Sequence, residues 1–538
     1  MSSASTSSGN SLPYKMRNLG QACKPLVEIL LNDSRSSYIK TYSTMDKLEG
    51  VVSITAERDT RFEDIDITFT GKQETQTVSF ASIRAKNCSG TSKTYVEKMT
   101  TTAAVSGRSE ARHQFLKLTQ PIPQSAYPQP RILERGRTYK FPFLFVVPTQ
   151  LLPMVCQHRV GNAQITEAHL KLPPSLGDPD ASGVGKALLD DLAPDMAKIS
   201  YAINAKVRQI RETGGKVSTV AEKTKKVRIV PASEEQPPLN VDEKDEDYAL
   251  RNERTIRKGV FKGKLGRLVM EAAQPKSLRL PAPSPTASSA PVTAMTTVIL
   301  RFDPAEENSP PPRLGAMSSK LKVITFSASS VRTTIPSRAM TRFDMSQSYY
   351  SESLSLSSRC MESVEWTHHS SSSLASSSDL ERRDSAFSTL SSSSTSSRAI
   401  EASSAYRSGS YYTTRLLVPV TLPKNKSFVP TFHSCLISRT YSLDLHLSVN
   451  GTGVSAPSLT LKVPVQISAE ASAEHWSEVS EFAQGAIEAV RESEQYFVPR
   501  SVAPPAADLL ERGNIAAQGL PPSYSFFAPA VARVPVCV

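Results

Sequence analysis

The sequence predicts an all-β protein built from two β-sandwiches in tandem, and three observations support this. Short apolar segments that alternate with polar residues recur along most of the chain, and turn residues bound each segment. Helical periodicity of comparable strength is missing from the first two hundred residues. Long stretches of Ser, Pro and Thr interrupt the pattern and cannot bury a core. With 538 residues, 39% of them hydrophobic, we expect two folded domains with disordered insertions and a disordered tail.

The first sandwich is expected over residues 21–210, after a Ser-rich, disordered N-terminus at residues 1–20. Its clearest strand is 64–70 (DIDITFT), whose apolar residues alternate strictly with polar ones. This pattern is typical of an antiparallel strand with one face on a core. Further strands are expected at 26–31, 48–55, 113–118, 138–147 and 198–207.

One of these segments carries a family resemblance. Residues 136–148 read Gly-x-x-Tyr-x-Phe-Pro-Phe-x-Phe-x-x-Pro and resemble the middle of an arrestin N-terminal domain. Residues 48–52, 172–177 and 196–207 fit the same family, so most of residues 20–210 resembles the fungal arrestin-like proteins, the α-arrestin class. The resemblance implies two arrestin-type, immunoglobulin-like β-sandwiches.

The chain departs from that family pattern at residues 72–90. Members of the family usually pass quickly from the strand that ends near Gly71 into a segment like 91–96. The additional residues are either a genuine loop or an unspliced intron in the gene model, and the sequence leaves both alternatives open.

Residues 211–256 are expected to form a charged linker. A basic stretch comes first and an acidic one follows, so the segment is either a solvated connector or a basic patch that faces anionic lipid or acidic tails. The basic residues are Lys216, Lys223, Lys225, Lys226 and Arg228.

The second sandwich is expected over residues 257–470, and residues 424–467 resemble the second arrestin domain. A Ser-rich loop at 370–410 interrupts it and contains Arg382-Arg383-Asp384-Ser385, so Ser385 is a candidate phosphorylation site for a basophilic kinase. The strands of the second sandwich are expected at 259–272, 298–302, 321–327, 359–366, 411–422, 431–437, 441–449 and 459–467.

Two segments follow the second sandwich. Residues 471–498 predict an amphipathic helix, which either packs on the sandwich or faces a membrane or a partner. Residues 499–538 form a Pro-rich tail that contains Leu520-Pro521-Pro522-Ser523-Tyr524. Two prolines favour the polyproline II conformation, and a tyrosine two positions later fills a second pocket, which is how WW domains read Pro-Pro-x-Tyr peptides. We expect Pro521, Pro522 and Tyr524 to bind a WW domain, with Leu520 as a flank.

The sequence shows no active site, so we expect a protein that is not an enzyme and that needs no cofactor. It contains no Gly-rich phosphate loop, no Gly-x-Ser-x-Gly elbow and no His-Glu-x-x-His. The cysteines lie far apart without Cys-x-x-Cys or a histidine at ligand spacing, so neither a disulfide scaffold nor a metal site is expected. Five histidines stand singly and are interpreted as structural or surface residues: His113, His158, His169, His433 and His446.

The charge balance of the chain indicates which class of partner it binds. The chain carries 63 Lys and Arg against 51 Asp and Glu, a net charge of +12, which favours an anionic partner. The basic residues are dispersed and do not alternate with aromatic residues, so nucleic acid is not expected. No run of about 18 apolar residues occurs, and residues 1–10 lack the apolar core of a signal peptide. We expect a cytoplasmic protein.

The resemblance implies an arrestin-related adaptor that is recruited peripherally to the plasma membrane or endosomes. Such an adaptor binds the cytoplasmic tails of membrane transporters or receptors, with an anionic membrane surface as a further candidate partner. Its Pro-Pro-x-Tyr peptide recruits a HECT-type ubiquitin ligase, which promotes ubiquitination and endocytosis of the cargo. The alternative is a ligase-independent arrestin-fold scaffold in endosomal sorting or pH signalling. An enzyme whose site is not visible in the sequence is a third, weaker alternative.

Overall fold

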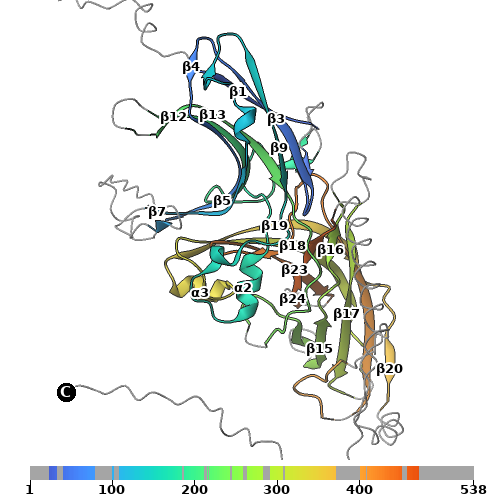
Figure 1. Ribbon diagram of the computed structural model, residues 1–538. Coiled ribbons are helices and arrows are strands. Elements are labelled where there is room, and N and C mark those ends of the chain that lie inside the picture. The colour runs from blue at the N-terminus through green and yellow to red at the C-terminus, as the bar shows by residue number, and fades with distance from the viewer. Residues whose placement is uncertain are drawn as a thin grey trace, which may run out of the picture. The chain divides into compact units, whose positions relative to one another are not determined.

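A computed structural model shows two β-sandwiches that share a junction (Figure 1). The described residues are 24–32, 40–78, 100–101, 108–184, 187–210, 215, 217–242, 245–258, 263–282, 291–306, 309–370, 400–407, 409–450 and 457–471.

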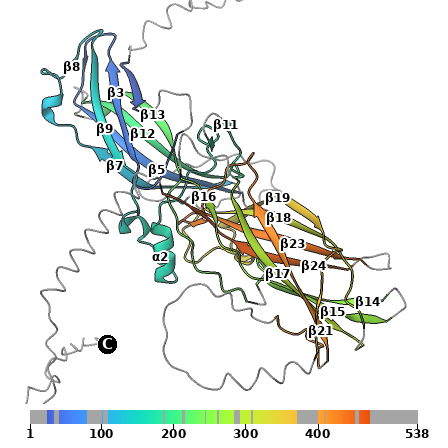
Figure 2. The same cartoon turned by 90° about the vertical axis from the view of Figure 1, so that its right-hand side faces the viewer.

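The first sandwich consists of two facing sheets, which Figure 1 shows as separate layers and Figure 2 shows from another side. The smaller sheet has the order β1 (Leu26–Leu31), β3 (Lys47–Thr55), β9 (Thr138–Val146). The larger sheet has the order β2 (Thr41–Tyr42), β13 (Val217–Ile229), β12 (Ala197–Ile210), β5 (Asp64–Val78), β7 (Arg108–Gln120), β6 (Thr100–Thr101).

Alternation along the strands builds the core of this sandwich. On β5, Ile65, Ile67 and Phe69 are almost fully buried, as the period-2 pattern predicts. They face the aromatic residues of β9, and the rings of Phe69 and Phe145 lie 5.9 Å apart. Pro142 also lies within β9, opposite Val51 of β3. Because β9 is an edge strand, its proline costs no ladder hydrogen bond on the open side.

Strand β5 extends beyond the point where the sequence departs from the family pattern. Residues 72–78 continue the strand between β12 and β7. Gln73 and Thr75 are buried, and Thr75 Oγ1 donates a hydrogen bond to Ala328 O of the second sandwich, 2.6 Å away. These seven residues therefore belong to the fold, whereas residues 79–99 lie outside the described part of the chain.

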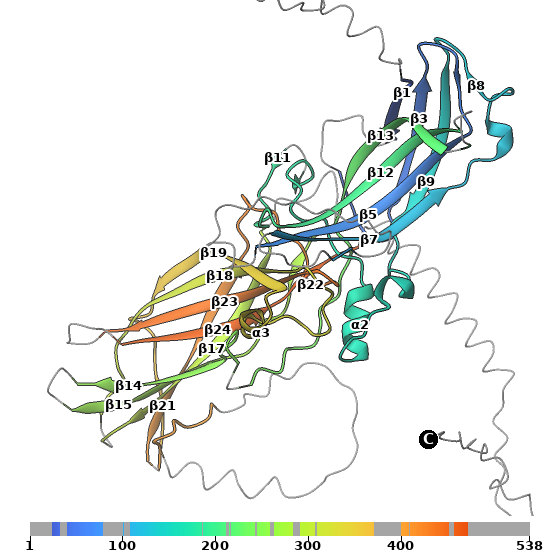
Figure 3. The ribbon, with the colours of Figure 1, turned by 90° about the vertical axis from the view of Figure 1, so that its left-hand side faces the viewer.

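The second sandwich also has two sheets (Figure 3). Its core consists of buried Leu, Val and Phe residues from both sheets, including Leu300, Phe302, Leu443 and Leu461. One sheet has the order β14 (Arg251–Arg257), β15 (Lys264–Ala272), β17 (Thr293–Pro304), β21 (Tyr411–Thr421), β20 (Thr367–His369). The other has the order β19 (Gln347–Cys360), β18 (Leu314–Ala328), β23 (Ile437–Val449), β22 (Phe432–His433), and β24 (Ser458–Val465) pairs with β23.

Short elements complete the described chain. The two α-helices among the described residues are α2 (Ala163–Leu170) and α3 (Arg338–Phe343), and α2 contacts β22 at the junction (Figures 1 and 3). No described helix has both the length and the apolar character that crossing a membrane requires. The remaining elements are β4 (Thr60–Arg61) with β8 (Ile132–Leu133), β10 (Gly183–Val184) with β11 (Ala187–Leu188), β16 (Leu278–Leu280) with β25 (Ile467–Ala469), and the 3-10 helices η2 (Gln124–Ala126) and η3 (Pro153–Cys156).

The predicted linker at 211–256 differs from the structure. Residues 217–229 form β13, which pairs with β12 along its length. The basic stretch is therefore not a continuous patch: Lys223 and Lys225 are exposed, Lys226 pairs with Asp178 and Asp180, and Arg228 is buried. Successive side chains of a strand point to opposite faces, which separates charges that are neighbours in sequence.

The acidic part of that segment is also bound to the fold. Asp247 accepts a hydrogen bond from the backbone nitrogen of Arg338 on α3, at 2.9 Å, and Glu246 pairs with Arg342 at the same distance. Ala249 and Lys462 of β24 exchange two backbone hydrogen bonds. The segment thus packs across the second sandwich.

The sheets confirm the predicted all-β fold of two arrestin-type β-sandwiches. A strand predicted at 359–366 is wrong, because β19 ends at Cys360 and β20 begins at Thr367. The predicted N-terminal segment 1–20, the amphipathic helix 471–498 apart from Ala471, and the tail 499–538 lie outside the described residues.

Candidate functional site

Neither of the two sequence-predicted sites falls within the described residues. Leu520, Pro521, Pro522 and Tyr524 lie beyond Ala471, and Ser385 lies between Ser370 and Ile400. The structure does describe how the chain on both sides of Ser385 attaches to the second sandwich. It also brings together two groups of residues at the junction that the sequence did not predict.

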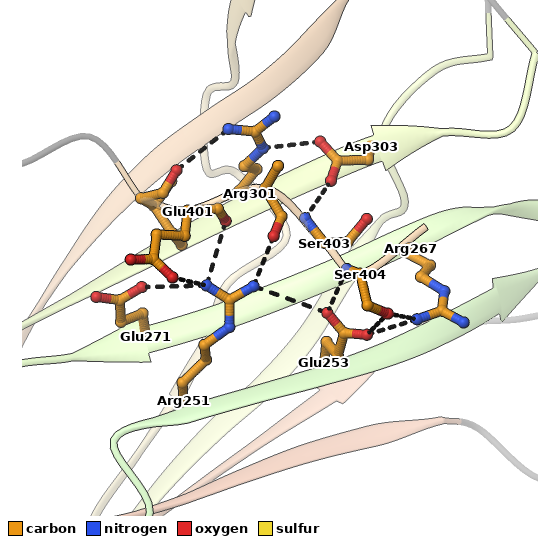
Figure 4. Close-up of polar contacts among 11 residues, drawn as sticks. Arg251, Glu253, Arg267, Glu271, Arg301, Asp303, Glu401, Ser403 and Ser404 are labelled. Carbon is orange, nitrogen blue, oxygen red and sulfur yellow. Dashed lines mark hydrogen bonds and ion pairs between the residues drawn. The ribbon is translucent and has the colours of Figure 1, made fainter. Parts of the chain in front are cut away.

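The chain on both sides of the Ser385 segment contacts the same sheet. It leaves from β20, where the ring of His369 stacks on Tyr411 of β21 at 4.7 Å between centroids. It resumes at Ile400, whose carbonyl accepts a hydrogen bond from Arg301 Nη1 at 3.1 Å (Figure 4). Arg301 is buried and also pairs with Asp303 Oδ1 at 2.8 Å. Because Leu300 and Phe302 face the core, Arg301 and Asp303 face the opposite side of the sheet.

Side chains of the sheet bind backbone groups of residues 400–404 and hold these residues on that face (Figure 4). Asp303 accepts a hydrogen bond from the backbone nitrogen of Ser403 at 2.8 Å, and Glu253 accepts one from Ser404 at 3.0 Å. Arg251 Nη2 donates to the carbonyl of Ala402 at 2.7 Å. Because these side chains recognise backbone groups, they fix the path of the chain that follows the candidate phosphorylation site.

Polar side chains connect the two sandwiches at the junction. Arg228 of β13 donates to Ser427 Oγ at 2.7 Å, and Arg439 of β23 donates to Asp191 O at 3.1 Å. Lys426 pairs with Asp190 at 2.7 Å, and its hydrogen bond is the main reason why the pKa of Asp190 is lowered. Burial lowers the pKa of Arg228. We interpret these contacts as structural, since each satisfies a backbone or side-chain group of the other sandwich.

Two cysteines and two histidines form a second group at the junction, here called the Cys–His cluster: Cys156, His158, His169 and Cys435. One ligand atom from each residue lies within 4.8 Å of the others. Cys156 Sγ lies 3.3 Å from His158 Nε2 and 3.6 Å from His169 Nδ1, and His158 Nε2 lies 3.4 Å from Cys435 Sγ.

Burial sets the protonation of this cluster. It raises the pKa of the Cys435 thiol to about 12 and lowers the pKa of His169 to about 4. It also raises the pKa of the Cys156 thiol. Each shift favours the uncharged form, because a low-dielectric interior disfavours ions. At neutral pH Cys156 and Cys435 are therefore thiols, and His169 is a neutral imidazole.

The expectation that no histidine stands near a cysteine at ligand spacing is wrong. Cys156, His158 and His169 lie within one short segment, 13 positions apart at most. The close spacing of these three residues was therefore visible in the sequence. Cys435 was not predictable, since 277 positions separate it from His158 and only the junction brings them together.

Part of the second sandwich matches a known family. Residues 315–469, under a third of the chain, match the family model described as Bul1 C terminus. The matched segment contains β18 to β25 of the second sandwich, including Cys435. That family is linked to adaptor function for a HECT-type ubiquitin ligase in protein trafficking. No curated protein matches the chain.

Proposed function

We propose that this protein is an arrestin-like adaptor that brings a HECT-type ubiquitin ligase to membrane transporters or receptors. The match of residues 315–469 to the Bul1 C terminus carries the proposal. The two tandem sandwiches and the Pro-Pro-x-Tyr motif at 521–524 support it. In this proposal the chain acts in the cytoplasm, and its cargo recruits it to the plasma membrane or to endosomes.

The proposed mechanism is an increase in effective concentration, and the chain itself makes or breaks no bond. The motif begins fifty positions after Ala471, the last described residue. A chain of that length spans at most about 170 Å. A ligase held by the motif is therefore confined near cargo that is bound to the sandwiches. Tethering of this kind turns a weak contact into a frequent one without any new interface.

The motif offers a direct test with a matched control in the same tail. Pro504-Pro505 is followed by two alanines and so lacks the tyrosine that the second WW pocket requires. We expect the purified full chain to bind WW domains of a HECT-type ligase, Tyr524→Ala to weaken binding at least tenfold, and Pro505→Ala to leave it unchanged. Isothermal titration calorimetry or fluorescence anisotropy measures the affinity of the wild type and of each variant for the WW domains. Equal binding by the wild type and Tyr524→Ala would refute recruitment through this motif. If the chain showed equal binding and still acted in the sorting of its cargo, it would be the ligase-independent scaffold.

Phosphorylation of Ser385 is proposed as the regulatory step. A phosphate adds about two negative charges beside Arg382 and Arg383. The described residues on either side of this segment, His369 and Ile400, both contact one sheet of the second sandwich. We expect phosphorylation to weaken the binding of cargo or ligase. If Ser385→Ala and wild type remove cargo from the membrane equally under all nutrient conditions, this step has no role.

A further inference from the structure

We propose that Cys156, His158, His169 and Cys435 form a structural zinc site that fastens the two sandwiches together. The site is distinct from the ligase motif and does not depend on the proposed adaptor function. Its geometry, its surroundings and its donor set support it independently.

The spacing of the ligand atoms fits a tetrahedral zinc ion. Zn–S bonds of about 2.3 Å and Zn–N bonds of about 2.0–2.1 Å at tetrahedral angles place S and N atoms about 3.5 Å apart. Three of the four S–N distances in the cluster are 3.3, 3.4 and 3.6 Å. All four ligand atoms lie within 4.8 Å of one another. The side chains therefore need only small adjustments to hold the ion.

Three of the four ligands belong to the first sandwich, and local structure sets the positions of their side chains. Cys156 ends the 3-10 helix η3, and His158 follows two positions later. His169 lies in the last turn of α2, one turn after the buried Ile165. Asn162 caps the start of this helix, and its side chain accepts a hydrogen bond from the backbone nitrogen of Ile165 at 3.0 Å. This cap fixes the start of the helix and with it the direction of His169.

The fourth ligand comes from the second sandwich. Cys435 lies in the turn between β22 and β23, and the backbone nitrogen of Arg332 donates a hydrogen bond to its carbonyl at 3.0 Å. The cysteine is almost fully buried in the core cluster that also contains Cys156. A metal bound to all four residues would thus link segments of both sandwiches covalently.

The surroundings of the cluster favour metal binding in two ways. His158 Nδ1 donates to the carbonyl of Arg159 at 3.3 Å, which leaves the lone pair of Nε2 for a metal. Arg332 is buried, and its Nε and Nη2 atoms have no hydrogen-bond partner among the described residues. A thiolate at Cys435 would give this cation the negative neighbour that the neutral thiol does not provide.

The donor set identifies zinc as the expected ion. Two thiolates neutralise the charge of Zn²⁺, so the complete site is uncharged and suits a buried location. Two cysteines with two histidines are typical of closed structural zinc sites, whereas Mg²⁺ and Ca²⁺ prefer oxygen ligands. With four protein ligands no position remains open for a substrate. We therefore assign the site a structural role.

The test is the metal content of the full chain, purified without a histidine tag after expression with zinc. We expect about one zinc per chain by mass spectrometry of the element. We expect Cys435→Ser and His158→Gln to bind zinc at least tenfold more weakly. Cys360→Ser is the matched control, because Cys360 is an exposed thiol outside the cluster. Cobalt(II) in place of zinc should give the visible absorption of a tetrahedral thiolate site in wild type and control.

Unfolding provides a second readout that does not depend on activity. A chelator should lower the unfolding temperature of the wild type and of Cys360→Ser, since zinc bound to the native state stabilises it. The chelator should not change the unfolding temperature of Cys435→Ser. A folded wild type that holds no zinc and no cobalt would overturn the proposal. A Cys156–Cys435 disulfide in the intact chain, or equal zinc content in Cys435→Ser, would also overturn it.

Discussion

His113, on β7, is buried in the first sandwich, and its surroundings favour the neutral imidazole. Its Nδ1 accepts a hydrogen bond from Gln73 Nε2 at 2.8 Å, and Gln73 Oε1 accepts one from Ser434 Oγ at 2.7 Å. Burial, with a smaller contribution from the charge of His158, lowers the pKa of His113 from 6.5 to about 4. This histidine thus belongs to a polar contact between the sandwiches.

The lowered pKa of His113 predicts a loss of stability in acid. The unfolded chain takes up a proton near pH 6.5, whereas the folded chain takes it up only near pH 4. Between these values the unfolded state binds more protons, so the free energy of unfolding falls as the pH falls. The contribution of this residue is fully present above pH 6.5, and up to about 3 kcal/mol is lost by pH 4.

Two measurements check this prediction. Hydrogen exchange at the imidazole C2 position, followed by mass spectrometry, should give His113 a pKa near 4. The unfolding midpoint in urea should fall less steeply between pH 6.5 and 4 in His113→Gln than in the wild type. Parallel pH profiles for the two proteins would show that this residue does not titrate as proposed.

Sequence reasoning at this scale predicted which residues are buried but not which residues are partners. Alternation identified Ile65, Ile67 and Phe69 as core residues, because burial of a strand face depends only on local spacing. The contact between Gln73 and Ser434 joins residues 361 positions apart. No local pattern encodes such a contact. The same reason explains why Cys435 was missed as a member of the Cys–His cluster.

At the scale of elements, the acidic stretch before β14 provides a matched pair of substitutions. Asp247 is mostly buried and pairs with Arg338, whereas Glu246 and Arg342 form a solvent-exposed pair. Asp247→Ala should destabilise the contact with α3 by about 1–3 kcal/mol, because it removes hydrogen bonds to charged, partly buried groups. Glu246→Ala should cost less than about 1 kcal/mol.

Backbone hydrogen exchange distinguishes these two variants. In Asp247→Ala the amides of residues 245–250 should exchange faster than in the wild type, and in Glu246→Ala they should change little. Equal protection in both variants would mean that the segment does not depend on this ion pair. It would then be closer to the solvated linker that the charge run predicted. The sequence could not reveal the docking, because Asp247 and Arg338 are 91 positions apart.

At the scale of the whole molecule, two sandwiches provide the domains and the junction joins them. The sequence predicted the fold class because short alternating strands recur throughout the chain. It did not predict the junction, whose contacts between Arg228 and Ser427 and between Arg439 and Asp191 arise only when both sandwiches have formed. The Pro-Pro-x-Tyr motif at 521–524 stays a prediction from the sequence alone, which is possible because such a peptide carries its own recognition chemistry.

We propose that this protein directs a ubiquitin ligase to membrane proteins through Tyr524. The most direct test compares ubiquitin-modified peptides of membrane proteins, by quantitative mass spectrometry, in cells whose only copy of the chain is wild type, Tyr524→Ala or Pro505→Ala. We expect a set of transporters or receptors whose ubiquitination falls several-fold in Tyr524→Ala and stays at the wild-type level in Pro505→Ala. Identical ubiquitination in all three strains, with the proteins equally abundant, would contradict it.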